Sequence, residues 1–216
     1  RRVDALIVDH TLDNDPRLEQ LQAAGFPFLA LGRSHLPEPY AWFDFDNYAG
    51  TYTATRRLIE QGHQRIALLG ESNNQAFITQ RRQGYLDALN EAGLSSEWLR
   101  TMPPSRRAGY TTTQALLALD VAPTAIVTDC NTHGDGAAMA LAQMGRLTGE
   151  NAVALVVYDG LPQDSIVDID VAAVIQSTRQ GVGKQIADMV LQLINGDDIS
   201  QLQVLWQPEF SPGQTA

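Results

Sequence analysis

The sequence predicts an α/β fold in which parallel sheets are covered by helices on both faces. Short, continuous apolar runs recur along the chain, segments with helical periodicity lie between them, and glycines close several of those segments. Strands buried on both faces are apolar throughout, whereas half-exposed strands alternate apolar and polar residues. The unbroken runs therefore favour doubly wound sheets.

The apolar runs are each expected to form a buried strand, and a shorter stretch at Trp42 to Phe45 lies between the second and third of them. The runs are Ala5 to Val8, Phe28 to Leu31, Ile66 to Leu69, Ala125 to Val127, Ala152 to Val157, Ala172 to Ile175 and Val204 to Trp206.

Helices are expected between these strands. The clearest one carries an apolar stripe at helical spacing, Val182, Ile186, Met189, Val190 and Leu193, and Asn195-Gly196 closes it. The others run through Leu18 and Leu21 after Asp13 to Asp15, from Asp46-Asn47 to Gln61-Gly62, along Tyr85 to Ala92 before Gly93, and along Ala137 to Met144 before Gly145.

Composition excludes several classes of protein. With 216 residues and 44% hydrophobic residues, the chain can bury one large core or two smaller ones. A net charge of −10 argues against direct binding of nucleic-acid phosphates by these residues. The single cysteine, Cys130, excludes an internal disulfide and suits a reducing compartment. Asp4 and Asp9 interrupt a start that resembles a leader peptide, and the sequence has no apolar run long enough for a membrane span.

The candidate site residues follow the predicted strands, because ligands of open α/β sheets bind beyond the carboxyl ends of the strands. Arg81 lies at the start of a predicted helix, where its guanidinium can lean toward the same edge. The residues that directly follow strands are Asp9-His10, Asp46-Asn47, Asp129-Cys130-Asn131, Asp159 and Gln176.

Each candidate also has a purely structural interpretation. Arg81 offers donors to hydroxyls or a carboxylate, or is a solvated helix residue. Asp159 accepts from ligand hydroxyls, or caps the turn at Gly160. Gln176 binds ligand, or satisfies a chain crossing between lobes. Asn131 faces the ligand, or caps the next helix.

Signatures of catalysis and of metal binding are missing from the sequence. No GxSxG elbow occurs, and the segment 181–185 fails as a phosphate loop because Gln185 stands where Ser or Thr is required. We therefore expect no enzyme, no cofactor and no metal site. The histidines have no metal-ligand spacing: His10, His35, His63 and His133.

One long spaced pattern resembles the sensor domain of the LacI/GalR (lactose-repressor/galactose-repressor) family of transcriptional regulators. It comprises Asp46-Asn47-Tyr48-Ala49-Gly50, Ala54 and the stretch from Leu58 through Gly62-His63 to Gly70. Further pieces follow in the family's order along the chain: Arg81 to Tyr85, Pro123 to Val127, Gly136-Ala137, Val157-Tyr158-Asp159 and Val174-Ile175-Gln176.

The resemblance implies a periplasmic-binding-protein-like fold of two doubly wound lobes joined by three crossings. The N-terminal lobe is expected at 1–62 plus 177–202, without its first strand and helix units, and the C-terminal lobe at 63–176 plus 203–216. A helix-turn-helix headpiece of the family is expected to be absent from the chain.

The resemblance also implies the function, which is sensing of a small sugar-like effector in the cleft by a cytoplasmic, homodimeric regulator. The regulator would contact operator DNA only through the headpiece. A periplasmic sugar-binding component of an ABC transporter is the alternative, and the effector's identity and its role as inducer or corepressor stay open. The pocket residues carried over from the family are Asp9, Ala49, Phe77, Arg81, Asp159 and Gln176. Asn131 is a further predicted ligand-binding residue because it follows a strand, although members of the family usually carry Asn-Asp where this chain has Cys130-Asn131.

Overall fold

The structure, a computed structural model, describes residues 3–176 and 181–216. The chain divides into two compact α/β units, and no helix among the described residues is long and apolar enough to cross a membrane. The smaller unit comprises Arg1–Asp46, Asn74–Thr79 and Ser177–Gln207. The larger unit comprises Asn47–Asn73, Gln80–Gln176 and Pro208–Ala216.

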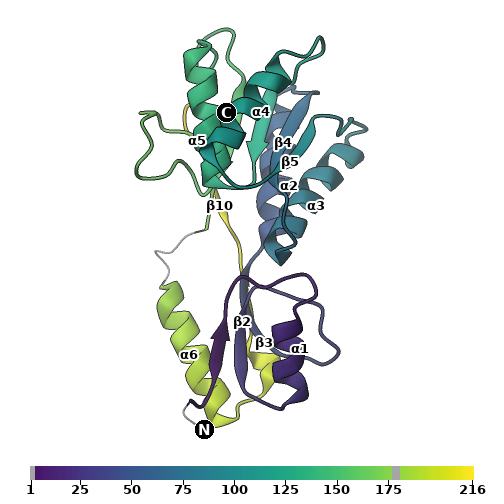
Figure 1. The fold of residues 1–216 in the computed structure, drawn as a ribbon, viewed down its shortest axis with the longest axis vertical. Coiled ribbons are helices and arrows are strands. Elements are labelled where there is room, and N and C mark those ends of the chain that lie inside the picture. The colour runs from purple at the N-terminus through teal and green to yellow at the C-terminus, as the bar shows by residue number, and fades with distance from the viewer. Residues whose placement is uncertain (1–2, 177–180) are drawn as a thin grey trace. The chain divides into compact units, whose positions relative to one another are not determined.

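The smaller unit is built on a four-stranded parallel sheet with the order β1-β2-β3-β9. One helix covers each face (Figure 1). Leu18 of α1 packs with Val8 and Phe28, while Met189 of α6 packs with Leu29 and Phe43 on the other face. The elements are β1 (Leu6–Val8), α1 (Pro16–Ala23), β2 (Phe28–Leu31), β3 (Ala41–Phe45), α6 (Val182–Asn195), the 3-10 helix η1 (Ile199–Gln201) and β9 (Gln203–Trp206).

The larger unit is built on a six-stranded sheet with the order β10-β8-β7-β6-β4-β5. Its strands are parallel except at the β10 edge, which pairs antiparallel with β8. The elements are α2 (Asn47–Glu60), β4 (Ile66–Glu71), α3 (Ala76–Glu91), β5 (Leu99–Met102), α4 (Arg106–Leu117), β6 (Ala125–Thr128), α5 (Asn131–Gln143), β7 (Ala154–Tyr158), β8 (Ala172–Ile175) and β10 (Glu209–Ser211). The first turn of α3, up to Thr79, belongs to the smaller unit.

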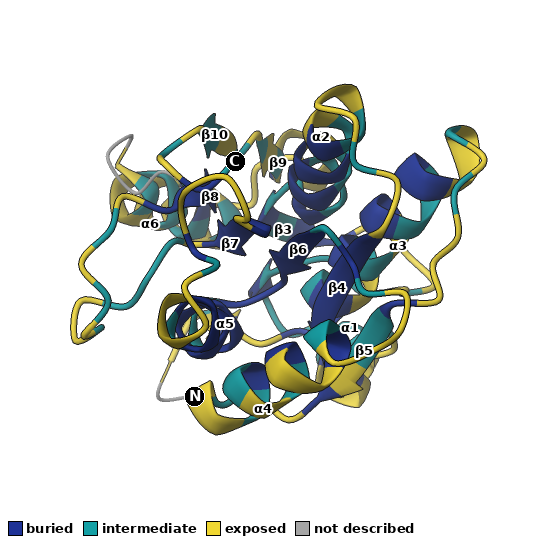
Figure 2. Cartoon of the chain, turned by 90° about the horizontal axis from the view of Figure 1, so that it is seen from above, coloured by how far each residue is buried: buried dark blue, intermediate teal, exposed yellow. Residues whose placement is uncertain are grey.

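Helices cover both faces of this larger sheet, with α4 and α5 on one side and α2 and α3 on the other (Figure 2). Neighbouring residues of a strand point to opposite faces, so each central strand serves two cores. Leu69 packs in the core beneath α5, whereas Leu68 packs in the core beneath α2 and α3. This arrangement confirms the predicted doubly wound α/β class.

Strands β5 and β10 and helix α4 were not predicted from the sequence. The β5 segment carries Arg100 and Thr101 in its centre, so it lacks the continuous apolar run of a central strand. In α4, the buried positions include Gly109 and Thr113, which do not register as an apolar stripe. Strand β10 is only three residues long.

The predicted burial of the strands is wrong at the edges of the smaller sheet. Leu6 and Ile7 of β1 are exposed, and so is Leu205 of β9. Both strands lie at the ends of the strand order within the described residues. An edge strand has a neighbour on one side only, so an apolar run there does not guarantee burial.

The boundaries between the units also differ from the predicted lobes 1–62 plus 177–202 and 63–176 plus 203–216. Helix α2 belongs to the larger unit, because its Ala54 and Leu58 pack in the same core as Val156. Strand β9 belongs to the smaller unit, because it pairs with β3. Residues 177–180 of the predicted N-terminal lobe lie outside the described residues.

Helices α4 and α5 approach closely because glycines line their contact. A Cβ added at Gly109 would lie 2.3 Å from the carbonyl oxygen of His133, and one at Gly136 would lie 2.0 Å from that of Arg106. Both neighbours are backbone atoms, which cannot rotate away.

We expect Gly109→Ala to lower the free energy of unfolding by about 1–3 kcal/mol, because the methyl group overpacks this contact. Gly183→Ala in α6 is the matched control, since a Cβ there meets open space. It should stabilise by about 0.5–1 kcal/mol through lower chain entropy in the unfolded state. Urea denaturation measures both changes, and a Gly109→Ala protein as stable as wild type would contradict the packing.

Candidate functional site

A buried arginine lies at the carboxyl ends of the strands of the larger unit. Arg81, in α3, is only 5% exposed. Its Nε donates to Asn47 Oδ1 at 3.0 Å, and its Nη1 donates to the Asp129 backbone carbonyl at 2.5 Å. The guanidinium carbon lies 3.5 Å from the centre of the Tyr158 ring. A buried charge is expensive unless it is hydrogen-bonded, so these neighbours hold the guanidinium in one orientation.

Asn47 joins several segments of the chain at this point. Besides Arg81, its Oδ1 accepts from Gln176 Nε2 at 2.9 Å and from the Tyr158 hydroxyl at 3.5 Å. The Thr51 hydroxyl, one turn further along α2, donates to the Arg81 carbonyl at 2.6 Å. Burial raises the pKa of the Tyr158 hydroxyl, although Arg81 opposes the shift, so this phenol keeps its proton at neutral pH.

Asp159 directly follows β7 and has a φ of 65°, in the left-handed region. Its amide donates to the Val174 carbonyl at 2.7 Å, and the Gln176 backbone N–H bonds its carboxylate. Partial removal of the carboxyl group from water raises its pKa, and the charge of Arg81 offsets only part of this shift. A left-handed aspartate is uncommon, and such positions concentrate where a side chain must be aimed. Asp159 therefore adds an acceptor beside the donors of Arg81.

Two further predicted residues lie in the larger unit. Asn131 is the first residue of α5, and Ala49 lies in the first turn of α2, two residues after Asn47. Both are half-buried. Their predicted contacts with a ligand stay predictions.

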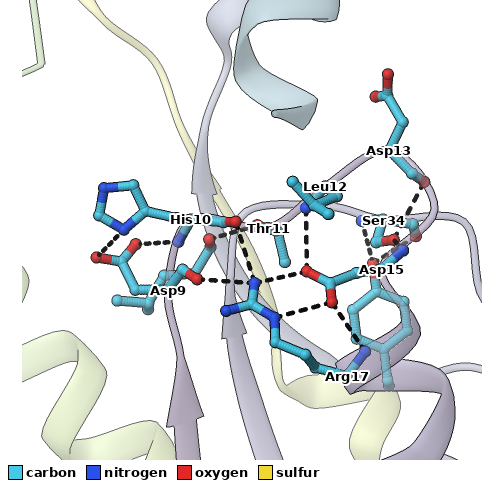
Figure 3. Close-up of polar contacts among 10 residues, drawn as sticks. Asp9, His10, Thr11, Leu12, Asp13, Asp15, Arg17 and Ser34 are labelled. Atoms are coloured by element: carbon cyan, nitrogen blue, oxygen red, sulfur yellow. Dashed lines mark hydrogen bonds and ion pairs between the residues drawn. The ribbon is translucent and has the colours of Figure 1, made fainter. Parts of the chain in front are cut away.

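Asp9 lies in the smaller unit, directly after β1. Its carboxylate accepts from the His10 amide at 2.7 Å and lies 3.1 Å from His10 Nδ1 (Figure 3). Arg17 donates to the carbonyls of Asp9 and His10, and buried Asp15 holds Arg17 at 2.7 Å. His10 has a φ of 53°. A left-handed residue thus follows β1, as it follows β7.

Phe77, also predicted as a pocket residue, lies in the first turn of α3 within the Asn74–Thr79 segment of the smaller unit, and it is half-buried. Its predicted ligand contact is not tested by the structure.

A second polar cluster is formed by Asp129, Cys130 and His133, next to the Asp129 carbonyl that binds Arg81. A carboxylate oxygen, the thiol sulfur and a ring nitrogen, one from each residue, lie within 4.8 Å of one another. His133 Nε2 is 3.1 Å from the Pro103 carbonyl. Burial lowers the pKa of His133, but Asp129 and Cys130 outweigh it and raise the value to about 10.

The structure brings together the predicted residues Arg81, Asp159 and Gln176. Asn47 was a candidate from the sequence but was not included in the predicted pocket, and Tyr158 was not a candidate. Asn47 was visible as a residue after a strand, although a role at the start of a helix accounted for it equally well. Tyr158 gives no such signal, because it is the last residue of an apolar strand.

These features define a domain with the periplasmic-binding-protein-like fold: doubly wound units with charged and amide side chains at the carboxyl ends of the strands. Residues 1–210 match the family described as periplasmic binding proteins and sugar binding domain of the LacI family. The chain belongs to this family.

Known relatives agree with this assignment. The HTH-type transcriptional regulator RafR of Escherichia coli is 59% identical over 100% of this chain and 64% of its own length. A structure from Yersinia pestis biovar Microtus, described as a transcriptional regulator, has a TM-score of 0.96 and 55% identity over 100% of this chain and 77% of that one. The CelR–cellobiose complex has a TM-score of 0.84 and 26% identity, over 100% and 66%. The chain thus spans 64% or less of the first curated relatives.

We expect Asn47→Ala to lower the free energy of unfolding by about 1–3 kcal/mol, because it removes the acceptor of Arg81 and Gln176 while the Arg81 charge stays buried. Tyr52→Phe is the control. It lies on the same helix and removes a partly exposed hydroxyl that donates to Glu91, so its effect should stay within about 0.5 kcal/mol. Equal urea midpoints for the two variants would contradict the role of Asn47.

Proposed function

We propose that the chain is the effector-sensing part of a LacI-type transcriptional regulator and binds a small sugar-like molecule at the Arg81 cluster. The observation that carries the proposal is the buried guanidinium of Arg81, held by Asn47, the Asp129 carbonyl and the Tyr158 ring. A side chain fixed in this way can bind a ligand without further ordering, which lowers the entropic penalty of binding.

The chemistry around Arg81 favours a hydroxyl-rich ligand. Arg81 supplies donors, the Asp159 carboxylate supplies acceptors, and the Gln176 amide supplies both. Vicinal hydroxyls donate and accept in the same way, so a neutral saccharide matches this set. The cellobiose in the CelR complex supports the same class of ligand. We propose Asp9, Ala49, Phe77 and Asn131 as further ligand contacts.

The proposed sensing mechanism couples effector binding to a conformational equilibrium of the regulator. An effector that binds one conformational state more tightly shifts the population toward that state, and DNA affinity changes if the two states bind operator differently. The proposal places operator DNA on parts of the regulator outside these residues, because the chain has a net charge of −10. A regulator of this kind acts in the cytoplasm.

A transporter component, the alternative function, is not favoured. RafR, AglR and CelR are all named as HTH-type transcriptional regulators.

We also propose a homodimer that forms through the surface around Ile166. This side chain is 82% exposed, and it lines a hollow of about 620 Å³ together with Met139, Leu147 and Val167. A large exposed apolar side chain beside an apolar hollow is typical of an interface.

Sedimentation velocity tests the dimer. The chain should sediment as a dimer, and Ile166→Lys should shift it toward the monomer, because a charge would be buried in the interface. Val121→Lys is the control, since Val121 is an exposed apolar residue of the same unit outside this hollow. An Ile166→Lys protein that sediments like wild type would exclude this surface.

Thermal-shift screening with neutral mono- and oligosaccharides, sugar phosphates and purine nucleosides should yield a stabilising saccharide. Arg81→Lys keeps the charge but loses the planar fork, so the affinity measured by calorimetry should fall about 10- to 100-fold. Arg107→Lys, an exposed change on α4, should leave the affinity unchanged. The proposal fails if no saccharide binds, or if Arg81→Lys binds the saccharide as tightly as wild type.

A further inference from the structure

The cluster of Asp129, Cys130 and His133 forms where β6 passes into α5. Asp129 directly follows the strand, Cys130 is the N-cap of α5, and His133 lies in the first turn of the helix. The helix start brings residues i and i+4 together, so the Asp129 carboxylate faces the His133 ring at 3.6 Å. Cys130 Sγ completes a triangle whose atoms lie within 4.8 Å of one another.

Two atoms of this cluster are buried and have no hydrogen-bond partner among the described residues: Asp129 Oδ1 and His133 Nδ1. The Asp129 side chain is 1% exposed and the His133 side chain is not exposed at all. Buried polar atoms are normally satisfied, so a pair of orphaned atoms facing each other points to a missing partner. Asp129 Oδ1 presents a lone pair and His133 Nδ1 presents one when it carries no proton, so a cation between them would satisfy both.

The atoms on the far side of each group are already engaged. His133 Nε2 faces the Pro103 carbonyl at 3.1 Å, which favours a proton on Nε2 and leaves Nδ1 as the nitrogen that can bind an ion once its own proton is lost. Asp129 Oδ2 accepts from the Glu71 amide at 2.8 Å. Metal-binding histidines and carboxylates are oriented by outer contacts of this kind.

We propose that Asp129 Oδ1, Cys130 Sγ and His133 Nδ1 form a binding site for a divalent transition-metal ion of the Zn²⁺ class. Thiolate and imidazole donors select such ions over Mg²⁺ and Ca²⁺, which prefer oxygen ligands. Binding releases the thiol proton of Cys130, and it releases any proton that His133 Nδ1 carries, to the solvent. Asp129 would then link the ion to Arg81, because its carboxylate would bind the ion while its backbone carbonyl accepts from Arg81 Nη1.

Titration of the reduced, metal-stripped chain with Co²⁺ tests the site through its optical spectrum. Wild type should develop a thiolate-to-cobalt charge-transfer band that saturates at one ion per chain and is abolished by excess Zn²⁺. Cys130→Ser should lose the band, and His133→Gln should weaken binding at least tenfold. His10→Gln is the matched control, because His10 pairs with Asp9 at an exposed position, and it should keep the band.

The proposal is overturned if wild type gives no such band, if Cys130→Ser retains it, or if His10→Gln abolishes it. Modification of Cys130 by a maleimide gives a second measurement that needs no variant. Zn²⁺ should slow this reaction at least tenfold in the native wild type, and Mg²⁺ should not. Equal rates with the two ions would overturn the proposal even if Cys130→Ser fails to fold.

Discussion

The burial of the Arg81 charge is the constraint on which the larger unit depends. A guanidinium removed from water must regain polar contacts. Arg81 forms hydrogen bonds at a helix start and a strand end, and its charge lies over an aromatic ring. Helix α2 must therefore come very close to Tyr158. Gly50 permits this, because a Cβ there would lie 2.6 Å from the Tyr158 hydroxyl oxygen. The close packing of α2 and the placement of the side chains around Arg81 therefore both follow from the burial of this charge.

The sequence predicts the doubly wound class well, because a strand buried on both faces must be apolar throughout. Runs such as Ile66 to Leu69 are typical of such strands when helical segments flank them. The unit boundaries are harder to predict. The apolar stripe of α2 would fit either sheet, and its place is decided by contacts with Val156 and Tyr158, which lie far along the chain. Local pattern carries no information about such contacts.

The residues of the proposed site likewise fall into those that the sequence predicts and those that it does not. Arg81, Asp159 and Gln176 could be predicted because strand ends and a family resemblance both pointed to them. Asn47 was a candidate but was left out of the predicted pocket, since it has a sufficient local role at a helix start. Tyr158 was missed because it is the last residue of an apolar strand. The cluster around His133 was missed because a metal search by sequence looks for repeated histidines or cysteines. In this cluster the three residues, Asp129, Cys130 and His133, are of different types and come together at the start of α5.

The hydrogen bond between Asn47 and Gln176 joins residues that are 129 positions apart. During synthesis, Asn47, Arg81 and Tyr158 all leave the ribosome before this last partner. Domains tend to fold as units as the chain emerges, so this cluster of contacts is among the last features of the larger unit to be completed. A nascent chain that has not yet exposed Gln176 lacks one of the donors to Asn47 Oδ1, so this set of contacts is complete only after translation has passed that residue.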